Sequence, residues 1–365
     1  MTTAASSVPA EGNKAGPSAS LDRDTLVSWL RDMMQIREFE IRTMQAYQNR
    51  LIGGFCHVYI GQEAVAVGCT AAVEPRDPIV TAYRCHGHGL ARGLEPRHAF
   101  AELFGRIGGC AKGKGGSMHF FDAGNEMYGG HGIVGAQTPL GAGLAFATKY
   151  EDEVLGGGRS DRVTLCFLGD GALNQGALHE AMNLAGLMDL PVIFIVENNG
   201  YSMGTSIARG TTMAHDLTSK ALGYGMDSAV IEGMDVCSVY DGMKPVADKC
   251  RAESRPAFVE IRTYRFKGHS MSDPRKYRTK EEEQQFEAQD PIDTLASLLR
   301  KRHAGTDEEH KRLTTEIRTE IRDAFKWAEQ SPEPSLEELF HDVYVERWGP
   351  YTGTSMPEFL KQRRG

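Results

Sequence analysis

The chain has 365 residues and a formal net charge of −8, so it can bury one large core or two modest ones, and it lacks the basic footprint of a nucleic acid partner. No apolar run approaches the 18 residues of a membrane span, so we expect no membrane partner. Seven cysteines form no C-x-x-C pair, which favours reduced thiols over disulfides or zinc ligands.

The N-terminal segment is poor in apolar residues. Residues 1–20 are rich in Ala, Ser, Pro and Gly and hold one Lys and no Arg, so we expect a disordered arm rather than a secretion signal or a transit peptide. A bacterial cytoplasmic location is the expectation that follows. Residues 21–348 are expected to form the folded domain, and residues 349–365 a C-terminal tail.

Helical and strand patterns alternate along the folded domain. Asp24 is expected to cap a helix that runs to about Gln48. Further helices are expected over Gly61–Ala72, His98–Phe104, Pro139–Tyr150 and residues 308–329. Two more are expected to begin at Lys280, after the cap Thr279, and at Pro291, after the cap Asp290. Strands are expected over Ile79–Tyr83, Val163–Leu168, Val192–Val196, Ala229–Ile231 and Phe258–Thr263. Residues 110–135 are too rich in glycine for regular structure. The alternation predicts an α/β fold, a mostly parallel sheet flanked by helices.

Two polar strand ends carry the clearest chemical signal. Asp170 lies in GDGALNQG after the run Val163–Leu168, and Asn199 lies in ENNGYSMGTS after Val192–Val196. A parallel crossover places both ends at one edge of the sheet, where open α/β sheets bind ligands. A carboxylate, an amide oxygen and the carbonyl of Tyr201 are ligands that Mg²⁺ or Ca²⁺ prefers. GDG is also a common turn, and an Asp after a strand is often only a helix cap.

Other motifs are weaker. Gly108-x-x-x-x-Gly113-Lys114 nearly matches a phosphate-binding P-loop, but Gly115 stands where Ser or Thr is needed, and no strand leads into it. Gly141-x-Gly143 lacks the third glycine of a dinucleotide fingerprint. A nucleotide hydrolase is therefore the weakest alternative.

Seven sequence blocks together resemble a known family. They are FCHVYIGQEAV (55–65), TAYRCHGHG (81–89), GGCAKGKGGSMH (108–119), GGHGIVGAQTPLGAG (129–143), GDGALNQG (169–176), ENNGYSMGTS (197–206) and TYRFKGHSMSDP (263–274). In this order they are similar to the alpha subunits of the thiamine-diphosphate-dependent 2-oxoacid dehydrogenases, and within that family to the pyruvate type. The resemblance implies the thiamine-diphosphate-binding fold.

The resemblance also implies roles for particular residues. Asp170, Asn199 and the Tyr201 carbonyl are expected to hold Mg²⁺. The residues expected to contact the diphosphate are Gly171, Ala172, Tyr83, Arg84 and His269. Those expected near the aminopyrimidine are Gly132, Val134 and Phe55, and Met203 is expected to hold the cofactor bent. The residues expected on the reaction side are His57, Gln175 and His269.

The implied reaction is oxidative decarboxylation of pyruvate with reductive acetylation of the lipoyl group of dihydrolipoyl acetyltransferase. In the family, a Glu from a separate beta subunit activates the cofactor, so we expect an α₂β₂ heterotetramer and a lipoyl-domain partner. An acetoin or branched-chain 2-oxoacid dehydrogenase alpha subunit is the alternative, and a non-catalytic paralogue is a remote one.

Overall fold

The computed structural model describes residues 16–156, 158–303 and 306–343. Within these ranges, the main element is a sheet of six parallel strands in the order β2-β1-β3-β4-β8-β7. The strands are β1 (Ile79–Ala82), β2 (Met127–His131), β3 (Thr164–Gly169), β4 (Val192–Asn198), β7 (Asp227–Glu232) and β8 (Ala257–Arg262). β5 (Tyr201–Ser202) and β6 (Thr205–Ser206) form a small antiparallel pair. The expectation of a mostly parallel α/β sheet flanked by helices is confirmed.

Helices cover both faces of this sheet. The longer ones are α1 (Arg23–Gln48), α2 (Glu63–Ala71), α4 (Pro96–Leu103), α5 (Gln137–Glu153), α6 (Gly176–Leu187), α9 (Val236–Glu253), α10 (Lys280–Glu287), α11 (Pro291–Arg302) and α12 (Thr306–Gln330). The shorter ones are α3 (His86–Ala91), α7 (Ile207–Gly210), α8 (Ser219–Leu222), and the 3₁₀ turns η1 (Pro17–Ser20), η2 (Gly116–Met118), η3 (Ala123–Asn125), η4 (Asp170–Asn174) and η5 (Leu336–Phe340).

Alternating side chains of the central strands divide the core into two layers. In β3 and β4, Leu165, Phe167, Ile193 and Ile195 join the larger cluster, which includes residues of α1, α2 and α9. The intervening residues join the smaller cluster under α5 and α6: Cys166, Leu168, Val192, Phe194 and Val196. Strands buried on both faces are apolar throughout, which is why the sequence shows them as continuous apolar runs.

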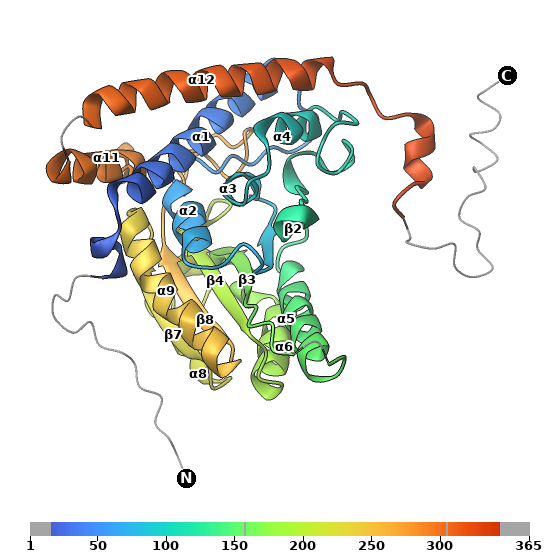
Figure 1. Cartoon of the computed structure of the whole chain (residues 1–365), viewed down its shortest axis with the longest axis vertical. Helices are drawn as coiled ribbons and strands as arrows, with labels where there is room; N and C mark the ends of the chain where they lie inside the picture. The colour runs from blue at the N-terminus through green and yellow to red at the C-terminus, as the bar shows by residue number, and fades with distance from the viewer. Residues whose placement is uncertain (1–15, 157, 304–305, 344–365) are drawn as a thin grey trace, which may run out of the picture.

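The long helices α1, α11 and α12 lie together at one end of the molecule, with α4 beside α12 (Figure 1). Leu313, Ile317 and Ile321 of α12 are buried at helical spacing, as predicted for this segment. Figure 1 also shows α9 over β7 and β8, with α5 and α6 beside β3. The helices therefore enclose the sheet but leave the carboxyl ends of its middle strands accessible to a cavity.

The strand order has a switch point between β1 and β3. The chain goes from β1 to its neighbour β2 on one side, then returns to place β3 on the other side of β1. Ligands of open α/β sheets bind in the crevice beyond the carboxyl ends of strands at such a point. The loops after β1, β2, β3 and β4 all begin at this edge.

Several expectations were wrong in detail. Asp22, not Asp24, caps α1 by accepting a hydrogen bond from the backbone N–H of Thr25. The glycine-rich stretch contains β2, an edge strand, where no regular structure was expected.

The predicted N-terminal arm is shorter than expected. The predicted disordered arm does not extend through Pro17–Ser20, which form η1, because Asp241 of α9 accepts hydrogen bonds from the backbone N–H and the hydroxyl of Ser18. Residues 1–15 and the predicted tail, residues 349–365, lie outside the described residues.

All seven cysteines are free thiols, as expected. Among the described residues, no helix combines the length and the apolar character needed to cross a lipid bilayer.

Candidate active site

A cavity of about 810 Å³ lies at the carboxyl ends of β1, β2, β3 and β4. Thirteen of the fourteen predicted site residues line it: Phe55, His57, Tyr83, Arg84, Gly132, Val134, Asp170, Gly171, Ala172, Asn199, Tyr201, Met203 and His269. Gln175 is not among these lining residues; its side chain lies beside Gly135, which does line the cavity, at 2.8 Å from where a Cβ atom on that glycine would be. Its role on the reaction side stays a prediction.

Asp170 and Asn199 follow the neighbouring strands β3 and β4, which pair in parallel up to Gly169 and Glu197. Asp170 is 4% exposed, and its Oδ2 atom has no hydrogen-bond partner among the described residues. Burial raises the pKa of the Asp170 carboxyl to about 6, although the Arg265 guanidinium opposes this shift. A buried carboxylate oxygen without a partner is costly, and a cation would satisfy it.

Arg265 lies beside the other two predicted metal ligands. Its Nη1 donates to Oδ1 of Asn199 at 2.9 Å and to the carbonyl of Tyr201 at 3.0 Å. Its Nη2 donates to the carbonyl of Met203 and to the hydroxyl of Tyr277, each at 3.0 Å. Arg265 thus ties the loop after β4 to the segment after β8 and holds two of the predicted ligand oxygens by hydrogen bonds.

The described residues contain no cluster of three or more His, Cys, Asp or Glu side chains that could hold a metal ion. The ligand set at this edge contains one carboxylate, with an amide oxygen and a backbone carbonyl. Such a set suits a hard cation that also takes oxygens from a phosphate group, as Mg²⁺ does in nucleotide sites.

Tyr83, Arg84 and His269 form the opposite wall. Arg84 donates from Nη1 to the carbonyl of Val58 at 2.7 Å and from Nη2 to the carbonyl of His269 at 2.8 Å. Asp273 accepts a hydrogen bond from the backbone N–H of His269 at 2.6 Å. Burial, followed by the charges of Arg84 and Arg265, lowers the pKa of His269 to about 4. This wall therefore offers a permanent guanidinium and a neutral imidazole.

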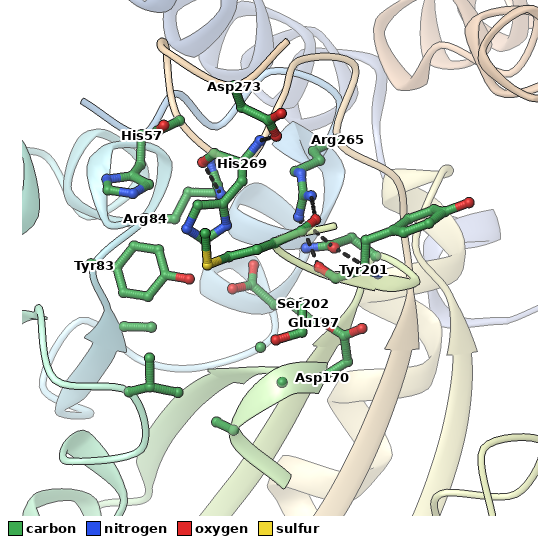
Figure 2. Close-up of a pocket in the computed structure, with 18 of the residues that line it drawn as sticks. His57, Tyr83, Arg84, Asp170, Glu197, Tyr201, Ser202, Arg265, His269 and Asp273 are labelled. Carbon is green, nitrogen blue, oxygen red and sulfur yellow. Dashed lines mark hydrogen bonds between the residues drawn. The ribbon is translucent and has the colours of Figure 1, made fainter. Parts of the chain in front are cut away.

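The His57 ring contacts the rings of Tyr83 and His269, with centroids 4.7 and 5.1 Å away (Figure 2). Burial is the largest cause that lowers the pKa of His57 to about 2, and the charge of Arg84 is the next. The imidazole is therefore neutral at physiological pH. Its Nδ1 is buried and has no hydrogen-bond partner among the described residues.

A buried polar chain holds the backbone of His57. The Ser117 hydroxyl accepts from the backbone N–H of His57 at 3.1 Å, and it lies 2.9 Å from Nε2 of His86. Nδ1 of His86 lies 3.0 Å from the Glu40 carboxylate, which also accepts from the backbone N–H of Tyr59 at 2.6 Å. The backbone is thus fixed on both sides of the His57 side chain.

The near P-loop motif folds around an internal anion. Glu102, at 0% exposure, accepts hydrogen bonds from four backbone N–H groups of the loop, those of Ala111, Gly113, Gly115 and Gly116, at 2.7–3.0 Å. Lys114, which a P-loop would direct at a phosphate, lies 3.0 Å from Asp342. Because the N–H groups of the loop already bind a carboxylate, it is not a nucleotide phosphate site.

Sequence reasoning missed several polar residues of the cavity wall, among them Gln62, Glu197, Arg265 and Asp273. These four lie within the quoted blocks, two to five residues from the nearest predicted site residue. Their contacts join segments that are far apart along the chain. Arg265 and Asn199 are more than 60 residues apart, and Gln62 and Glu197 more than 130. The blocks marked the region, but the sequence held no local signal for these pairings.

Parallel strands, a switch-point cavity, and a wall of arginine and histidine opposite oxygen ligands define an α/β enzyme domain that binds a phosphorylated cofactor. The chain matches the family model "Dehydrogenase E1 component" over residues 31–337. The chain belongs to this family.

Curated relatives are similar to this chain along most of their length. A protein of Zymomonas mobilis is 47% identical over 331 residues, covering 90% of each chain. One from Rickettsia bellii is 45% identical and covers 88% of this chain and 97% of its own. One from Rhizobium meliloti is 44% identical and covers 92% and 95%. Each is named "Pyruvate dehydrogenase E1 component subunit alpha".

Family membership confirms the expected class of enzyme. The chain is the thiamine-diphosphate-dependent component of a dehydrogenase, an oxidoreductase that acts on 2-oxo acids. The relatives are named as alpha subunits, the type to which the sequence blocks of this chain are similar.

Proposed function

We propose that the chain is the alpha subunit of a pyruvate dehydrogenase first component. It decarboxylates pyruvate and passes the acetyl group to the lipoyl group of dihydrolipoyl acetyltransferase. The observation that carries the proposal is the convergence of Arg84, Asp170, Asn199 and His269 around one cavity, in a chain 44–47% identical to relatives that bear this name. Thiamine diphosphate, when bound, supplies the carbanion that attacks the keto carbon and the electron sink for decarboxylation.

Mg²⁺ is the metal that the residues fit. Asp170, with its unpartnered Oδ2, the Oδ1 of Asn199 and the carbonyl of Tyr201 would hold it, and the cofactor diphosphate would complete the ligand set. Ca²⁺ accepts the same atoms, but a set of three protein oxygens with phosphate is the kind that Mg²⁺ uses.

The diphosphate would lie between Arg84 and the start of η4. Arg84 suits phosphate because its guanidinium is permanently charged and forms two parallel hydrogen bonds. A Cβ atom at Gly171 would lie 2.2 Å from the Ser202 hydroxyl, so only glycine fits there. Tyr83 and His269 would complete this side, together with the backbone at Ala172.

The pyrimidine end of the cofactor would lie at the open side of the cavity. Phe55 and Met203 are each 64% exposed and line it, with Gly132 and Val134. The backbone of Met203 has a positive φ of 54°, a conformation that non-glycine residues rarely adopt. His57, neutral and fixed by Ser117, would donate or accept a hydrogen bond at the reacting side.

A beta subunit would supply the missing activating carboxylate and the other half of the site, in an α₂β₂ heterotetramer. Large apolar side chains are exposed around the cavity mouth and on α5 and α6: Phe55, Ile133, Val134, Phe146, Tyr150, Leu184 and Leu187. A soluble chain rarely exposes so many unless a partner covers them. Relatives in bacteria favour a cytoplasmic enzyme.

The test is coexpression with a beta-type subunit encoded beside this chain. Carbon dioxide release is then measured with pyruvate, acetoin and 2-oxoisovalerate, each with thiamine diphosphate and Mg²⁺. We expect release from pyruvate only when both subunits are present. Higher kcat/KM with 2-oxoisovalerate than with pyruvate would identify the chain as a branched-chain 2-oxoacid dehydrogenase subunit. Turnover of acetoin would identify it as an acetoin dehydrogenase subunit.

A further inference from the structure

The side chain of Asn199 can bind a cation with only one of its two ends. The amide oxygen has lone pairs for a metal, whereas the amide nitrogen carries two hydrogens and repels it. The two ends have almost the same shape, so packing alone does not choose between them. The orientation of this amide must be set by hydrogen bonds.

Two donors and one acceptor around Asn199 agree on one orientation. Arg265 Nη1 and the backbone N–H of Tyr201 donate to Oδ1, at 2.9 and 3.4 Å. On the other end, Nδ2 of Asn199 donates to Oε1 of Gln62 at 3.2 Å. Gln62 is 1% exposed, just before α2, so water does not compete for this contact.

Gln62 has the same ambiguity, and Glu197 removes it. Nε2 of Gln62 donates to Oε1 of Glu197 at 3.4 Å. The same Glu197 oxygen accepts from the hydroxyl of Tyr59, so Gln62 turns its nitrogen toward this acceptor and its oxygen toward Asn199. Asn199 must then turn its nitrogen toward Gln62 and its oxygen toward the predicted metal position.

Glu197 is itself held as an acceptor. The hydroxyl of Tyr59 donates to its Oε1, and Nε2 of His88 lies 3.4 Å from the same atom. Burial, and then the charge of Glu197, raises the pKa of Tyr59 well above its ordinary value, so the phenol keeps its proton and donates. Glu197 is 5% exposed and lies on β4, two residues before Asn199 (Figure 2).

We propose that Glu197 and Gln62 are positioning residues that set the direction of the Asn199 amide, so that its oxygen faces the metal. The inference rests on the proposed function, in which Asn199 is a ligand of Mg²⁺. Glu197 accepts a hydrogen bond from Gln62, and this fixes Gln62 as the acceptor of a hydrogen bond from the Asn199 amide nitrogen. Neither residue touches the metal in this scheme; they act through the ligand.

Residues that orient metal ligands affect metal affinity by about 10- to 100-fold when they are replaced. Gln62→Met keeps the length of the side chain and removes both of its hydrogen bonds, so we expect affinity to fall within that range. Glu197→Gln keeps the packing, but its amide can donate or accept, so the amides of Gln62 and Asn199 can take either orientation. A smaller loss, between that of Gln62→Met and the parent, is expected.

Glu260→Gln is the matched control. Glu260 is a buried carboxylate on β8, 2% exposed, and it accepts from Nδ2 of Asn198 at 2.8 Å, next to the proposed chain of hydrogen bonds. The substitution removes a buried charge beside β4 without touching Gln62 or Asn199. Metal affinity in this variant should stay within about twofold of the parent.

The experiment uses the complex with the beta subunit, stripped of metal and supplied with excess thiamine diphosphate. Mn²⁺ is titrated in, and the free ion is measured by electron paramagnetic resonance, a readout that does not depend on turnover. Circular dichroism and the melting temperature without metal show whether each variant folds. If Gln62→Met does not fold, Glu197→Gln decides.

Weaker Mn²⁺ binding in the two variants, with the control unchanged, supports the proposal. Binding in both variants equal to the parent overturns it and leaves the proposed function intact. A parent complex that does not retain Mn²⁺ overturns the proposed metal, and this inference with it. An equal loss in the Glu260→Gln control also overturns the inference, because it would show a general effect of the strand.

Discussion

Replacing Glu102 by glutamine removes the charge around which the glycine-rich loop is folded. Both carboxylate oxygens accept two backbone N–H groups: Oε2 those of Ala111 and Gly113, and Oε1 those of Gly115 and Gly116. In glutamine one of these oxygens becomes an NH₂ group, which faces two donors and cannot accept from them.

The cost follows from this geometry. A hydrogen bond to a charged group contributes about 1.5–3 kcal/mol, and two such bonds are lost while the other two become neutral. Removal of the buried charge recovers part of its desolvation free energy. We therefore expect Glu102→Gln to lower the free energy of unfolding by about 3–5 kcal/mol. With an unfolding entropy of about 2.1 cal/mol/K per residue, this lowers the melting temperature by roughly 4–7 °C.

Thermal unfolding followed by circular dichroism measures this change. Glu95→Gln is the control, since Glu95 precedes the same helix, α4, and its side chain is 57% exposed. A melting temperature of Glu102→Gln within about 1 °C of the control would refute the reasoning. The loop continues into Ser117, which holds His57, so we also expect reduced turnover in the complex.

Three further outcomes are expected. Asp170→Asn abolishes carbon dioxide release by the complex while circular dichroism shows an intact fold; full activity would contradict the metal assignment. Ser117→Ala frees the backbone N–H of His57, so kcat should fall about tenfold with a loss of about 1–2 kcal/mol in stability, and an unchanged kcat would argue against positioning by Ser117. Between pH 7 and pH 5 the parent should lose about 2 kcal/mol more stability to urea than His57→Gln. The folded pKa of His57, about 2, lies below its ordinary 6.5, so the unfolded chain takes up the proton first; the stability is complete above about pH 6.5 and is lost as pH falls, and equal pH slopes would refute this.

The sequence predicted the parts of the fold that local patterns determine. The apolar runs of β3 and β4 and the caps Thr279 and Asp290 appear where they were expected. β2 was missed because two of the five residues in Met-Tyr-Gly-Gly-His are glycine, which is depleted in strands, and the strand is held by its pairing with β1. α9 was also missed, because Gly242 and Pro245 interrupt its pattern. Its buried face, which includes Val239, Met243 and Ala247, stabilises it against α2 and the sheet.

The site divides in the same way. Residues at strand ends, such as Asp170 and Asn199, were predictable because strand topology alone brings them to one edge. Arg265 was not, because its four acceptors lie in segments whose distance from it is set by tertiary packing. The chain from Glu40 through His86 to Ser117 was invisible for the same reason, since its members are 46 and 31 residues apart.

The charge distribution of the cavity leads to a last prediction. Arg84 and Arg265 are 7% and 1% exposed, and among the described residues neither lies within 4.0 Å of a carboxylate. Burial lowers the pKa of Arg84, which shows the cost of placing its charge there. Buried cations without counter-ions destabilise a fold by several kcal/mol, and a bound polyanion relieves this cost.

Inorganic pyrophosphate with Mg²⁺, at about 100 times its dissociation constant, should therefore stabilise the complex by about 2.7 kcal/mol and raise its melting temperature. Sulfate at equal ionic strength controls for general salt effects. Arg84→Met should melt no lower than the parent without ligand, because the uncompensated charge is gone, and it should gain less than half of the parent's shift with pyrophosphate. An equal shift in Arg84→Met and the parent would show that the anion binds elsewhere. The absence of any shift in the parent would show that the two guanidinium groups are arranged for hydrogen bonding within the protein and not for a diphosphate.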